Sequence, residues 1–402
     1  MNKLILYSFF FFGLFPLLPA RLAGLPVIVF FFAALHRAVR DRQIPNNFWK
    51  IIFWTSIYLS FAISFFYSEN IQLEALKALE TRLSLIVIPI GFLILSKENT
   101  QMLVKNMNMF KLIFTLSSFL LCLFYLCFLL IFEPSTNPAF GFPSGFFFKS
   151  AAIGTPFFTL EPVYFSFIIA IAIVTVISLL DEGKIKLLVS LLFCFIFISV
   201  LILLASKTAL IFTFTFFAWV IFYRIKKRTN RSLIAIAFIL IAIIVYNVPS
   251  LKYELKEIKN ITQSKKTAID DSMDKRARIT ISAFELSKIV NPIFGTGLGD
   301  VQDELNIIYK NRGYMDLLEK KYDPHNQFFS TYIGGGCLGL LILCFFLFQL
   351  LKKCINRNRV FLFWTVLFFI FQMLTETILE RQTPVILFSF FTSIILLYEN
   401  KK

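Results

Sequence analysis

The stretch DPHNQFFSTYIGGGCLGLLILCFFLFQLL, at residues 323–351, decides the fold: a polar segment ends at a histidine, and an apolar run follows at once. This run is long enough to cross a membrane, because about 20 apolar residues span a hydrocarbon core of about 30 Å. His325 therefore stands at the junction of a polar loop and a membrane helix. The rest of the chain can be interpreted as the scaffold that presents this histidine.

Apolar runs of the same kind recur along the chain. The 402 residues are 58% hydrophobic and include 53 phenylalanines, whereas about half of a soluble domain is apolar. The composition predicts an all-α polytopic membrane protein. Lys3 and the apolar run after it resemble a signal peptide. No small-residue cleavage site follows, so we expect this run to be the first membrane helix.

Hydropathy predicts about twelve transmembrane helices. The second and the fourth are short, which suggests tilted helices or half-spans. The predicted helices cover residues 4–20, 22–36, 48–67, 83–96, 109–132, 162–181, 185–204, 207–223, 232–248, 326–351, 359–375 and 382–398.

The basic residues predict how the chain crosses the membrane. A net charge of +16 in a soluble protein would suggest a nucleic-acid partner, but in a membrane protein Lys and Arg collect in cytoplasmic loops. We therefore expect no nucleic-acid partner. With both termini in the cytoplasm, most of the Lys and Arg outside the longest loop fall on the cytoplasmic side. The charge pattern thus predicts cytoplasmic termini and an outer location for that loop.

The chain divides into three predicted parts. Residues 1–248 hold helices one to nine, residues 249–325 form a large periplasmic loop, and residues 326–402 hold helices ten to twelve. A second outer loop, at 133–160, is rich in Pro, Gly, Ser and Phe.

The large loop has its own helical pattern. Residues 279–286 are amphipathic, and the dipeptide Asn291-Pro292 stops the helix that they predict. A glycine-rich turn follows, and then a second amphipathic segment near 301–311. We therefore expect a partly helical loop with two amphipathic helices.

The cysteines carry no recognisable chemistry. All six lie in or beside apolar runs, and none forms a CxxC motif or a Cys/His cluster. The sequence therefore predicts neither a structural disulfide nor a metal site.

Several charged side chains gather at the outer ends of the predicted helices. A charge within the bilayer costs several kcal/mol, so it persists mostly where it faces a cavity or a partner. The candidates are Glu161, Lys207, Arg276, Arg278, His325, Glu376, Glu380 and Arg381.

Each candidate also has a simpler interpretation. Lys207 can be a snorkelling side chain, Glu376 and Glu380 can belong to a solvated hairpin, and a lone histidine is more often structural than catalytic. Taken together, however, the groups suggest an outward-facing cationic cavity with one imidazole and a pair of carboxylates. Lys and Arg bind phosphate oxygens, and a neutral imidazole can accept a proton from an attacking hydroxyl. This chemistry fits an anionic lipid head group.

Four segments in this order resemble the O-antigen ligase/polymerase superfamily of bacterial inner-membrane glycosyltransferases. They are SKTA at 206–209, Arg278 with NPIFGTGLG at 291–299, HNQF at 325–328 followed by GGGCLGL at 334–340, and ETILERQ at 376–382. The resemblance covers the C-terminal half, and the N-terminal half is similar only in hydropathy.

The resemblance implies a GT-C-like fold and a metal-independent, cofactor-free transfer of a glycan from undecaprenyl pyrophosphate to an acceptor hydroxyl on the periplasmic face. The acceptor would be the lipid A core, a growing polysaccharide or a protein, and membrane lipids would surround the chain. His325 matches the proposed base, Arg278 the loop arginine, and Lys207 a position where the ligases have arginine. Arg276 is close enough to be the true match instead of Arg278. Glu161 stands where relatives often show histidine.

Three other functions compete with the ligase. A polymerase of the same superfamily differs only in its acceptor. A transporter or flippase for the same lipid would show internal repeats and broken helices at the midplane, and no convincing repeat is present. A non-catalytic scaffold would not need charges clustered on one side.

Overall fold

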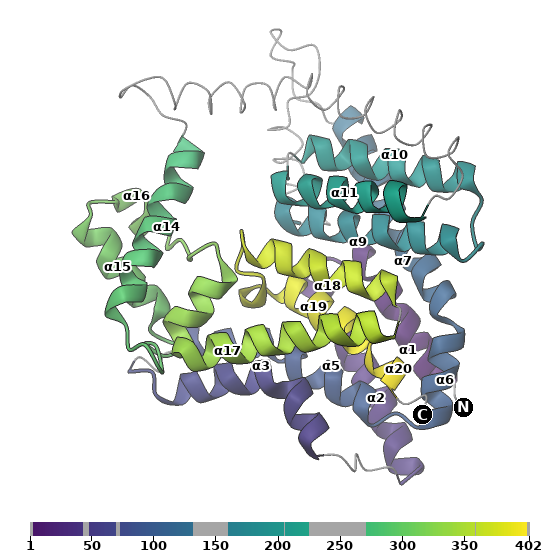
Figure 1. Cartoon of the computed structure of the whole chain (residues 1–402), viewed down its shortest axis with the longest axis horizontal. Coiled ribbons are helices and arrows are strands. Elements are labelled where there is room, and N and C mark those ends of the chain that lie inside the picture. The colour runs from purple at the N-terminus through teal and green to yellow at the C-terminus, as the bar shows by residue number, and fades with distance from the viewer. Residues whose placement is uncertain are drawn as a thin grey trace. The chain divides into compact units, whose positions relative to one another are not determined.

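A computed structural model describes residues 3–42, 48–69, 73–131, 160–204, 206–224, 271–357 and 359–399. Every regular element in these ranges is helical (Figure 1), which confirms the predicted all-α class for this part of the chain. The helices form two compact units.

The first unit comprises residues 1–15, 21–110 and 272–402. A 3-10 turn at Ile378–Glu380 separates its last two long helices. Its helices are α1 (Lys3–Gly13), α2 (Leu25–Arg40), α3 (Phe48–Phe66), α4 (Leu73–Arg82), α5 (Ser84–Leu93), α6 (Lys97–Lys105), α14 (Asp271–Ile289), α15 (Val301–Asn311), α16 (Met315–Glu319), α17 (Gln327–Asn356), α18 (Val360–Met373), α19 (Gln382–Ser393) and α20 (Leu396–Glu399).

The second unit comprises residues 16–20 and 111–271. It contains most of α7 (Met107–Ile131), together with α9 (Pro162–Asp181), α10 (Leu187–Leu203) and α11 (Lys207–Trp219), which continues as a π-helix over Val220–Arg224. Lys111 of α7 donates to Glu182 and Ser178 at the end of α9, at 2.6 and 2.9 Å. A buried contact of 2.9 Å between Thr115 and Thr175 joins the same two helices.

Most of the predicted helix bounds agree with the described ones, but the first predicted helix, 4–20, ends at Gly13 in α1. The predicted number of spans is not confirmed. Among the described residues, six helices are long and apolar enough to cross a membrane, and a bent pair raises this to seven at most. Four shorter apolar helices, α1, α10, α11 and α18, accompany them. The predicted helix at 232–248 and almost all of the predicted loop at 133–160 lie outside the described residues.

The predicted short span at 83–96 is part of a longer, broken arrangement. The polar helix α4 precedes α5 and the polar helix α6 follows it, and the helical axis bends by 105° between α5 and α6. In the loop, α14 covers the predicted amphipathic segment and ends before Pro292, and α15 coincides with the predicted second helix. The sequence did not predict α4, α6 or α16.

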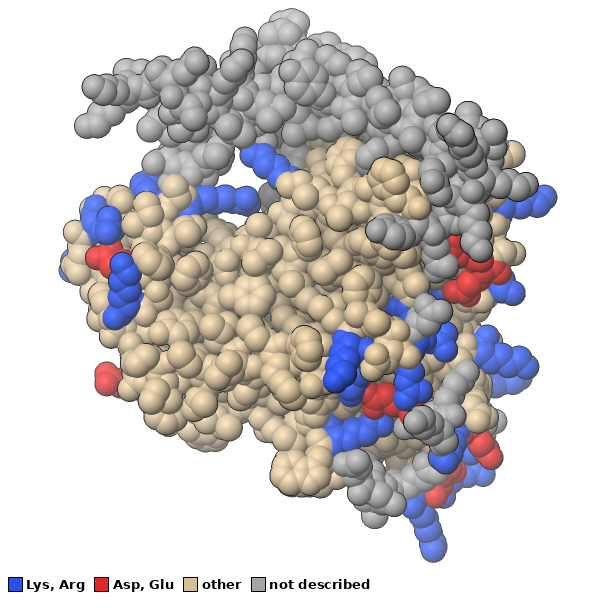
Figure 2. All heavy atoms as spheres, in the orientation of Figure 1, with Lys and Arg blue, Asp and Glu red and all other residues tan. Residues whose placement is uncertain are grey.

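Phenylalanine side chains build the core of the first unit. Phe12 stacks on Phe390 with ring centroids 4.0 Å apart, Phe9 meets Phe110 at 4.9 Å and Phe30 meets Phe92 at 4.7 Å. Aromatic pairs at such distances add to the gain from apolar burial. Figure 2 shows the outer surface over the middle of α3 and α17 largely without charged residues, as a lipid-facing surface requires.

Two lysines mark one level at an end of this unit. Glu399 accepts from Lys353 of α17 at 2.6 Å and from Lys50 of α3 at 3.1 Å. The helices α3 and α17 pack side by side between this level and their other ends, with Phe53 stacked on Phe346 at 5.2 Å. Lys50 on α3 and Lys353 on α17 therefore lie at the same height along the two helices.

The long helix α17 is broken at Gly336, whose backbone is non-helical with φ 59° and ψ −160°. The turn after α14 provides the hydrogen bonds that the broken helix lacks. The N–H groups of Thr296 and Gly297 donate to Ile333 and Gly334 at 2.8 and 3.0 Å. In return, Cys337 and Leu338 donate to the carbonyls of Pro292 and Ile293 at 2.8 and 3.3 Å.

The end of α3 holds the other side of this turn. The Tyr67 hydroxyl donates to the carbonyl of Phe294, and the Ser68 hydroxyl accepts from the N–H of Gly299 at 2.9 Å. The N–H of Leu298 donates to the carbonyl of Ser64 at 3.3 Å. The turn is thus fixed between two membrane helices.

Glycine is required where the turn and α17 meet. Gly336 and Gly295 both have positive φ, and a Cβ atom at either residue would overlap backbone atoms of the opposite segment. Gly335 differs, because a Cβ atom there meets nothing within 4 Å.

This contrast gives a matched pair of substitutions. Gly336→Ala should destabilise the protein by more than about 2 kcal/mol, because left-handed backbone strain costs about 1–2 kcal/mol and overpacking about 1–3 kcal/mol. Gly335→Ala should be neutral or stabilising by up to about 1 kcal/mol, since Ala favours a helix. Thermal unfolding of the purified variants in detergent measures both effects. Equal stability of the two variants would contradict the clamped turn.

Candidate active site

His325 lies just before α17 in a strained and well-supported conformation. Its φ of 46° is in the left-handed region, which is uncommon for a residue with a side chain. The N–H of His325 donates to the Asp323 carboxylate at 2.9 Å. Asn326 caps α17 by accepting from the N–H groups of Phe328 and Phe329, and its own amide donates to the carbonyl of Leu374 at 3.0 Å. These contacts hold the backbone of His325 between the loop before α17, the start of α17 and the end of α18.

A carboxylate holds one nitrogen of the imidazole. Nδ1 of His325 is 3.2 Å from Oε2 of Glu376, and the other oxygen of Glu376 is 3.3 Å from a guanidinium nitrogen of Arg276. Glu376 comes from the segment after α18, and Arg276 comes from the first turns of α14. The side chain of Glu376 is 12% exposed and that of Arg276 is 59% exposed. The carboxylate is therefore inside the cluster and the arginine faces out.

A second carboxylate completes this cluster. Oδ1 of Asp323 is 3.4 Å from Nδ1 of His325, and Oδ2 of Asp323 is 3.5 Å from a guanidinium nitrogen of Arg381. The structure thus brings together His325, Glu376, Arg276 and Arg381, four of the predicted site residues, and adds Asp323. We call these five residues the His325 cluster. The spacing of Asp323 two residues before His325 was the available signal for the added residue.

The surroundings of His325 shift the pKa of its imidazole in opposite directions. Burial lowers this pKa. The hydrogen bond with Glu376 and the negative charges of Asp323 and Glu376 raise it, and the charge of Arg276 lowers it slightly. The net effect raises the pKa of His325 above its usual 6.5. Because a carboxylate can only accept, the contact with Glu376 assigns the proton of a neutral imidazole to Nδ1 and leaves Nε2 as the unprotonated nitrogen.

Arg278 has a different environment from Arg276. Its two terminal nitrogens are 2.9 and 3.2 Å from the two carboxylate oxygens of Asp316 on α16, and its guanidinium lies 5.2 Å from the ring centre of Tyr314. This bidentate pair ties α14 to α16. Two residues along a helix are about 200° apart around its axis, which is why only one of the two arginines reaches the His325 cluster.

Glu380 has different neighbours from Glu376. It accepts from the Ser330 hydroxyl and is 3.8 Å from the guanidinium of Arg82. Burial raises the pKa of Glu380, and the charge of Asp323 raises it further, against the opposing effects of Arg82 and of the Ser330 hydrogen bond. The two glutamates therefore have different hydrogen-bond partners in this structure.

Sequence reasoning missed Arg82 as a member of this region. Its side chain is buried, its guanidinium lies 4.6 Å from the ring centre of Phe61, and it donates to the carbonyl of Ala78 at 2.7 Å. The signal was present, since an arginine directly before an apolar run needs a partner or a cavity.

Lys207 and Glu161 belong to the second unit. Lys207 begins α11 and Glu161 precedes Pro162 at the start of α9. The Ser206 hydroxyl donates to Ser166 of α9 at 2.9 Å, so the starts of these two helices lie at the same end of their unit. A shared role with the His325 cluster is a proposal that rests on the sequence pattern.

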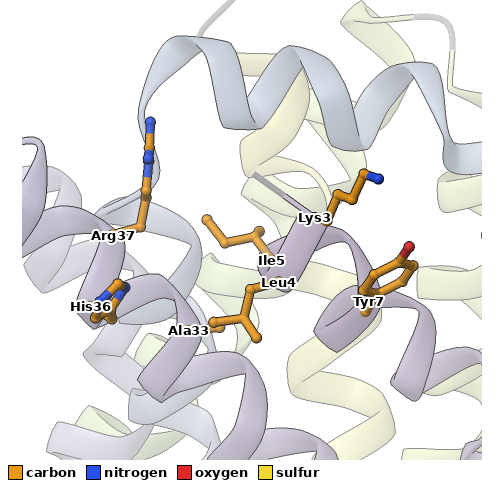
Figure 3. Close-up of a pocket in the computed structure, with 7 residues that line it drawn as sticks. All are labelled: Lys3, Leu4, Ile5, Tyr7, Ala33, His36 and Arg37. Carbon is orange, nitrogen blue, oxygen red and sulfur yellow. The ribbon is translucent and has the colours of Figure 1, made fainter. Parts of the chain in front are cut away.

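A separate cavity of about 390 Å³ lies in the first unit between the start of α1 and the end of α2 (Figure 3). Apolar side chains line it, and Lys3, His36 and Arg37 stand around it. None of the predicted site residues is part of this cavity. Among the residues that the structure describes, no group of three or more His, Cys, Asp or Glu side chains has the arrangement of a metal site.

The helical bundle and the polar cluster at the start of α17 define a multi-pass membrane protein with a candidate active site at the end of its spans. Residues 192–344 match the family model described as O-antigen ligase, so this part of the chain is similar to that family. The match includes Lys207, Arg276, Arg278 and His325. It confirms the resemblance seen in the sequence. No curated protein matches the chain.

The raised pKa of His325 makes a prediction about stability. A group whose pKa is higher in the folded protein stabilises it fully below the unfolded pKa, and this stabilisation is lost as the pH rises through the folded pKa. His325→Asn should therefore lower the melting temperature more at pH 6 than at pH 9 (two values on either side of ~6.5). Glu376→Gln is the matched control and should remove the same acid-side stabilisation. A pH-independent effect of both variants would contradict the ion pair.

Proposed function

We propose that the protein is an O-antigen ligase-like glycosyltransferase of the bacterial inner membrane. It transfers a glycan from undecaprenyl pyrophosphate to a hydroxyl of the lipid A core or a similar acceptor on the periplasmic face. The family match indicates O-antigen ligase/polymerase-type activity. The observation that carries the proposal is the His325–Glu376 contact, since a carboxylate on Nδ1 leaves Nε2 to act on a substrate.

In this proposal His325 is the general base. Nε2 accepts the proton of the acceptor hydroxyl while the hydroxyl oxygen forms a bond with C1 of the glycan. The bond between C1 and the pyrophosphate oxygen breaks, and its electron pair leaves with the lipid pyrophosphate. Glu376 stabilises the imidazolium that results, as the carboxylate does in other His–carboxylate pairs. His325 then releases its proton to water or to the leaving phosphate.

Arg276 is the loop arginine that we propose for the donor pyrophosphate. It is more than half exposed and lies next to the carboxylate that holds His325. Arg381 adds a second exposed positive charge to the His325 cluster. Lys207 stays a proposed donor contact on the basis of the sequence pattern alone. Arg278, in contrast, already has both terminal nitrogens on Asp316. We therefore propose a structural role for Arg278 in holding α14 on α16.

The level of the His325 cluster along α17 supports a site for a lipid head group. From Lys353 to Gln327 the helix rises by no more than about 40 Å at 1.5 Å per residue, and the kink at Gly336 shortens this distance. A bilayer has a core of about 30 Å and is about 40–45 Å thick with its head groups. With Lys353 at one edge of the core, His325 lies close to the head groups of the opposite leaflet, where the donor pyrophosphate would be.

The His325 role can be tested by transfer in vitro. Purified protein is given undecaprenyl-pyrophosphate glycan and either a lipid A core acceptor or a second glycan, so that the acceptor also separates ligase from polymerase. His325→Ala should lower the transfer rate by about 10²–10⁴-fold, the usual contribution of a general base. His325→Asn should be equally slow, because an amide cannot take up a proton. For the wild type, the rate should rise with pH through a pKa above 6.5.

Full activity of His325→Asn would reject the base role and leave the family assignment intact. Loss of donor binding in both variants would move His325 from proton transfer to donor recognition.

Substitutions of Arg276 and Arg278 should have different effects in the same assay. Arg276→Ala should reduce transfer by about 10- to 100-fold, the value of a charged hydrogen bond of about 1.5–3 kcal/mol, and should leave the melting temperature nearly unchanged. Arg278→Ala should mainly lower the melting temperature. The exchange Arg278→Asp with Asp316→Arg should restore both stability and transfer. Restored stability without transfer would return the donor role to Arg278.

A further inference from the structure

The helix α14 has two apolar faces, although it belongs to the predicted periplasmic loop. One face, with Ile279, Ala283 and Leu286, is buried in a core shared with α15 and α16. The other face is exposed. It carries Ile281 and Phe284, and Phe284 is 52% exposed.

The end of α14 and the turn after it add three more exposed apolar side chains. Ile289 is 68% exposed, Ile293 53% and Phe294 50%. We call Ile281, Phe284, Ile289, Ile293 and Phe294 the outer apolar face. Several exposed apolar side chains close together in sequence on a water-exposed loop would mark a contact site.

The depth of this surface follows from the two helices that hold the turn. About 25 Å of helix, at 1.5 Å per residue, separates Gly336 from Lys353 on α17, and the same length separates Tyr67 from Lys50 on α3. Both lysines meet Glu399 and so share one level. The turn contacts α17 next to Gly336, through the Cys337 N–H, and the end of α3, through the Tyr67 hydroxyl.

With the two lysines placed at one edge of a bilayer core of about 30 Å, the turn is within the thickness of that core, close to its far edge. Figure 1 shows α14, α15 and α16 grouped at the end of α17 that begins at Gln327. Their buried core and the exposed face of α14 are thus next to the membrane boundary and not far out in the water.

A basic side chain on the same face fits this position. The ammonium of Lys288 lies 4.3 Å from the ring centre of Phe284. At a membrane surface, an aromatic ring enters the apolar region while a lysine extends to the phosphates of the lipid head groups.

We propose that the outer apolar face is a membrane-binding surface that inserts into the phospholipid leaflet on the His325 side. The helices α14, α15 and α16 are then an interfacial part of the membrane domain, and the outer apolar face contacts the phospholipids of that leaflet. This surface fixes α14 at the height of the leaflet, and α14 carries Arg276. The proposal rests on the depth of the turn and not on the proposed transfer reaction.

Site-specific fluorescence tests the surface. The full-length protein, with the exposed cysteines Cys127, Cys337 and Cys344 replaced by alanine, receives one new cysteine and an NBD label. The test positions are Phe284→Cys, Ile289→Cys and Phe294→Cys, and the matched control is Lys310→Cys on an exposed side of α15. Each protein is placed in nanodiscs of phosphatidylethanolamine and phosphatidylglycerol, with and without nitroxide-labelled phosphatidylcholine.

Labels on the outer apolar face should emit at shorter wavelength than the label at the control position, and nitroxide lipid should quench them at least about two-fold more. Emission and quenching equal to those of the Lys310→Cys label would overturn the proposal. A blue shift without quenching by lipid would mean that protein covers the face, and this too would overturn it. Ile289→Cys keeps the test decisive if either phenylalanine variant fails to fold, because Ile289 is the most exposed member.

Discussion

A main-chain polar group without a hydrogen-bond partner costs several kcal/mol in a hydrocarbon environment, and α17 interrupts its own hydrogen-bond ladder at Gly336. The turn between α14 and α15 satisfies the exposed groups on both sides of this break. The same contact fixes the end of α14, which carries Arg276 near its start, relative to the first turns of α17, which follow His325. The hydrogen bonds that the broken helix α17 needs therefore set the position of α14, and with it Arg276, relative to His325.

The ion pair between Glu376 and Arg276 next to His325 is one that a charged substrate can break. Glu376 contacts both His325 and Arg276, and the positive charge of Arg276 lowers the pKa of the imidazole. In the proposed mechanism a donor pyrophosphate attracts Arg276 away from Glu376. The carboxylate would then act on His325 alone, and the imidazole would become a stronger base when the donor is in place. Donor binding and proton acceptance are coupled in this way through one glutamate.

The sequence predicted the apolar helices well, because hydropathy reports directly which segments enter a membrane. It placed α9 at its observed bounds, and Asn291-Pro292 marked the end of α14. It missed α4 and α6, since these helices are polar and their place depends on packing. The sequence pattern also predicted that His325, Arg276 and Glu376 lie on the same side of the membrane. It did not distinguish Arg276 from Arg278, because the choice depends on which side of α14 meets Asp316. Arg82 escaped notice because its partner, Glu380, is distant in sequence.

The exchange of hydrogen bonds between the turn and α17 also has a consequence for biosynthesis. The ribosome makes α3 first, the turn much later, and α17 last. The carbonyls of Pro292 and Ile293 can meet their partners only after residues 333–338 have left the ribosome and entered the membrane. Until then the turn has only the end of α3 to bind. The insertion of α17 is thus the step that completes the packing of α14, α15 and α16. A chain that ends before α17 keeps most of their shared core but lacks the partners that fix the turn.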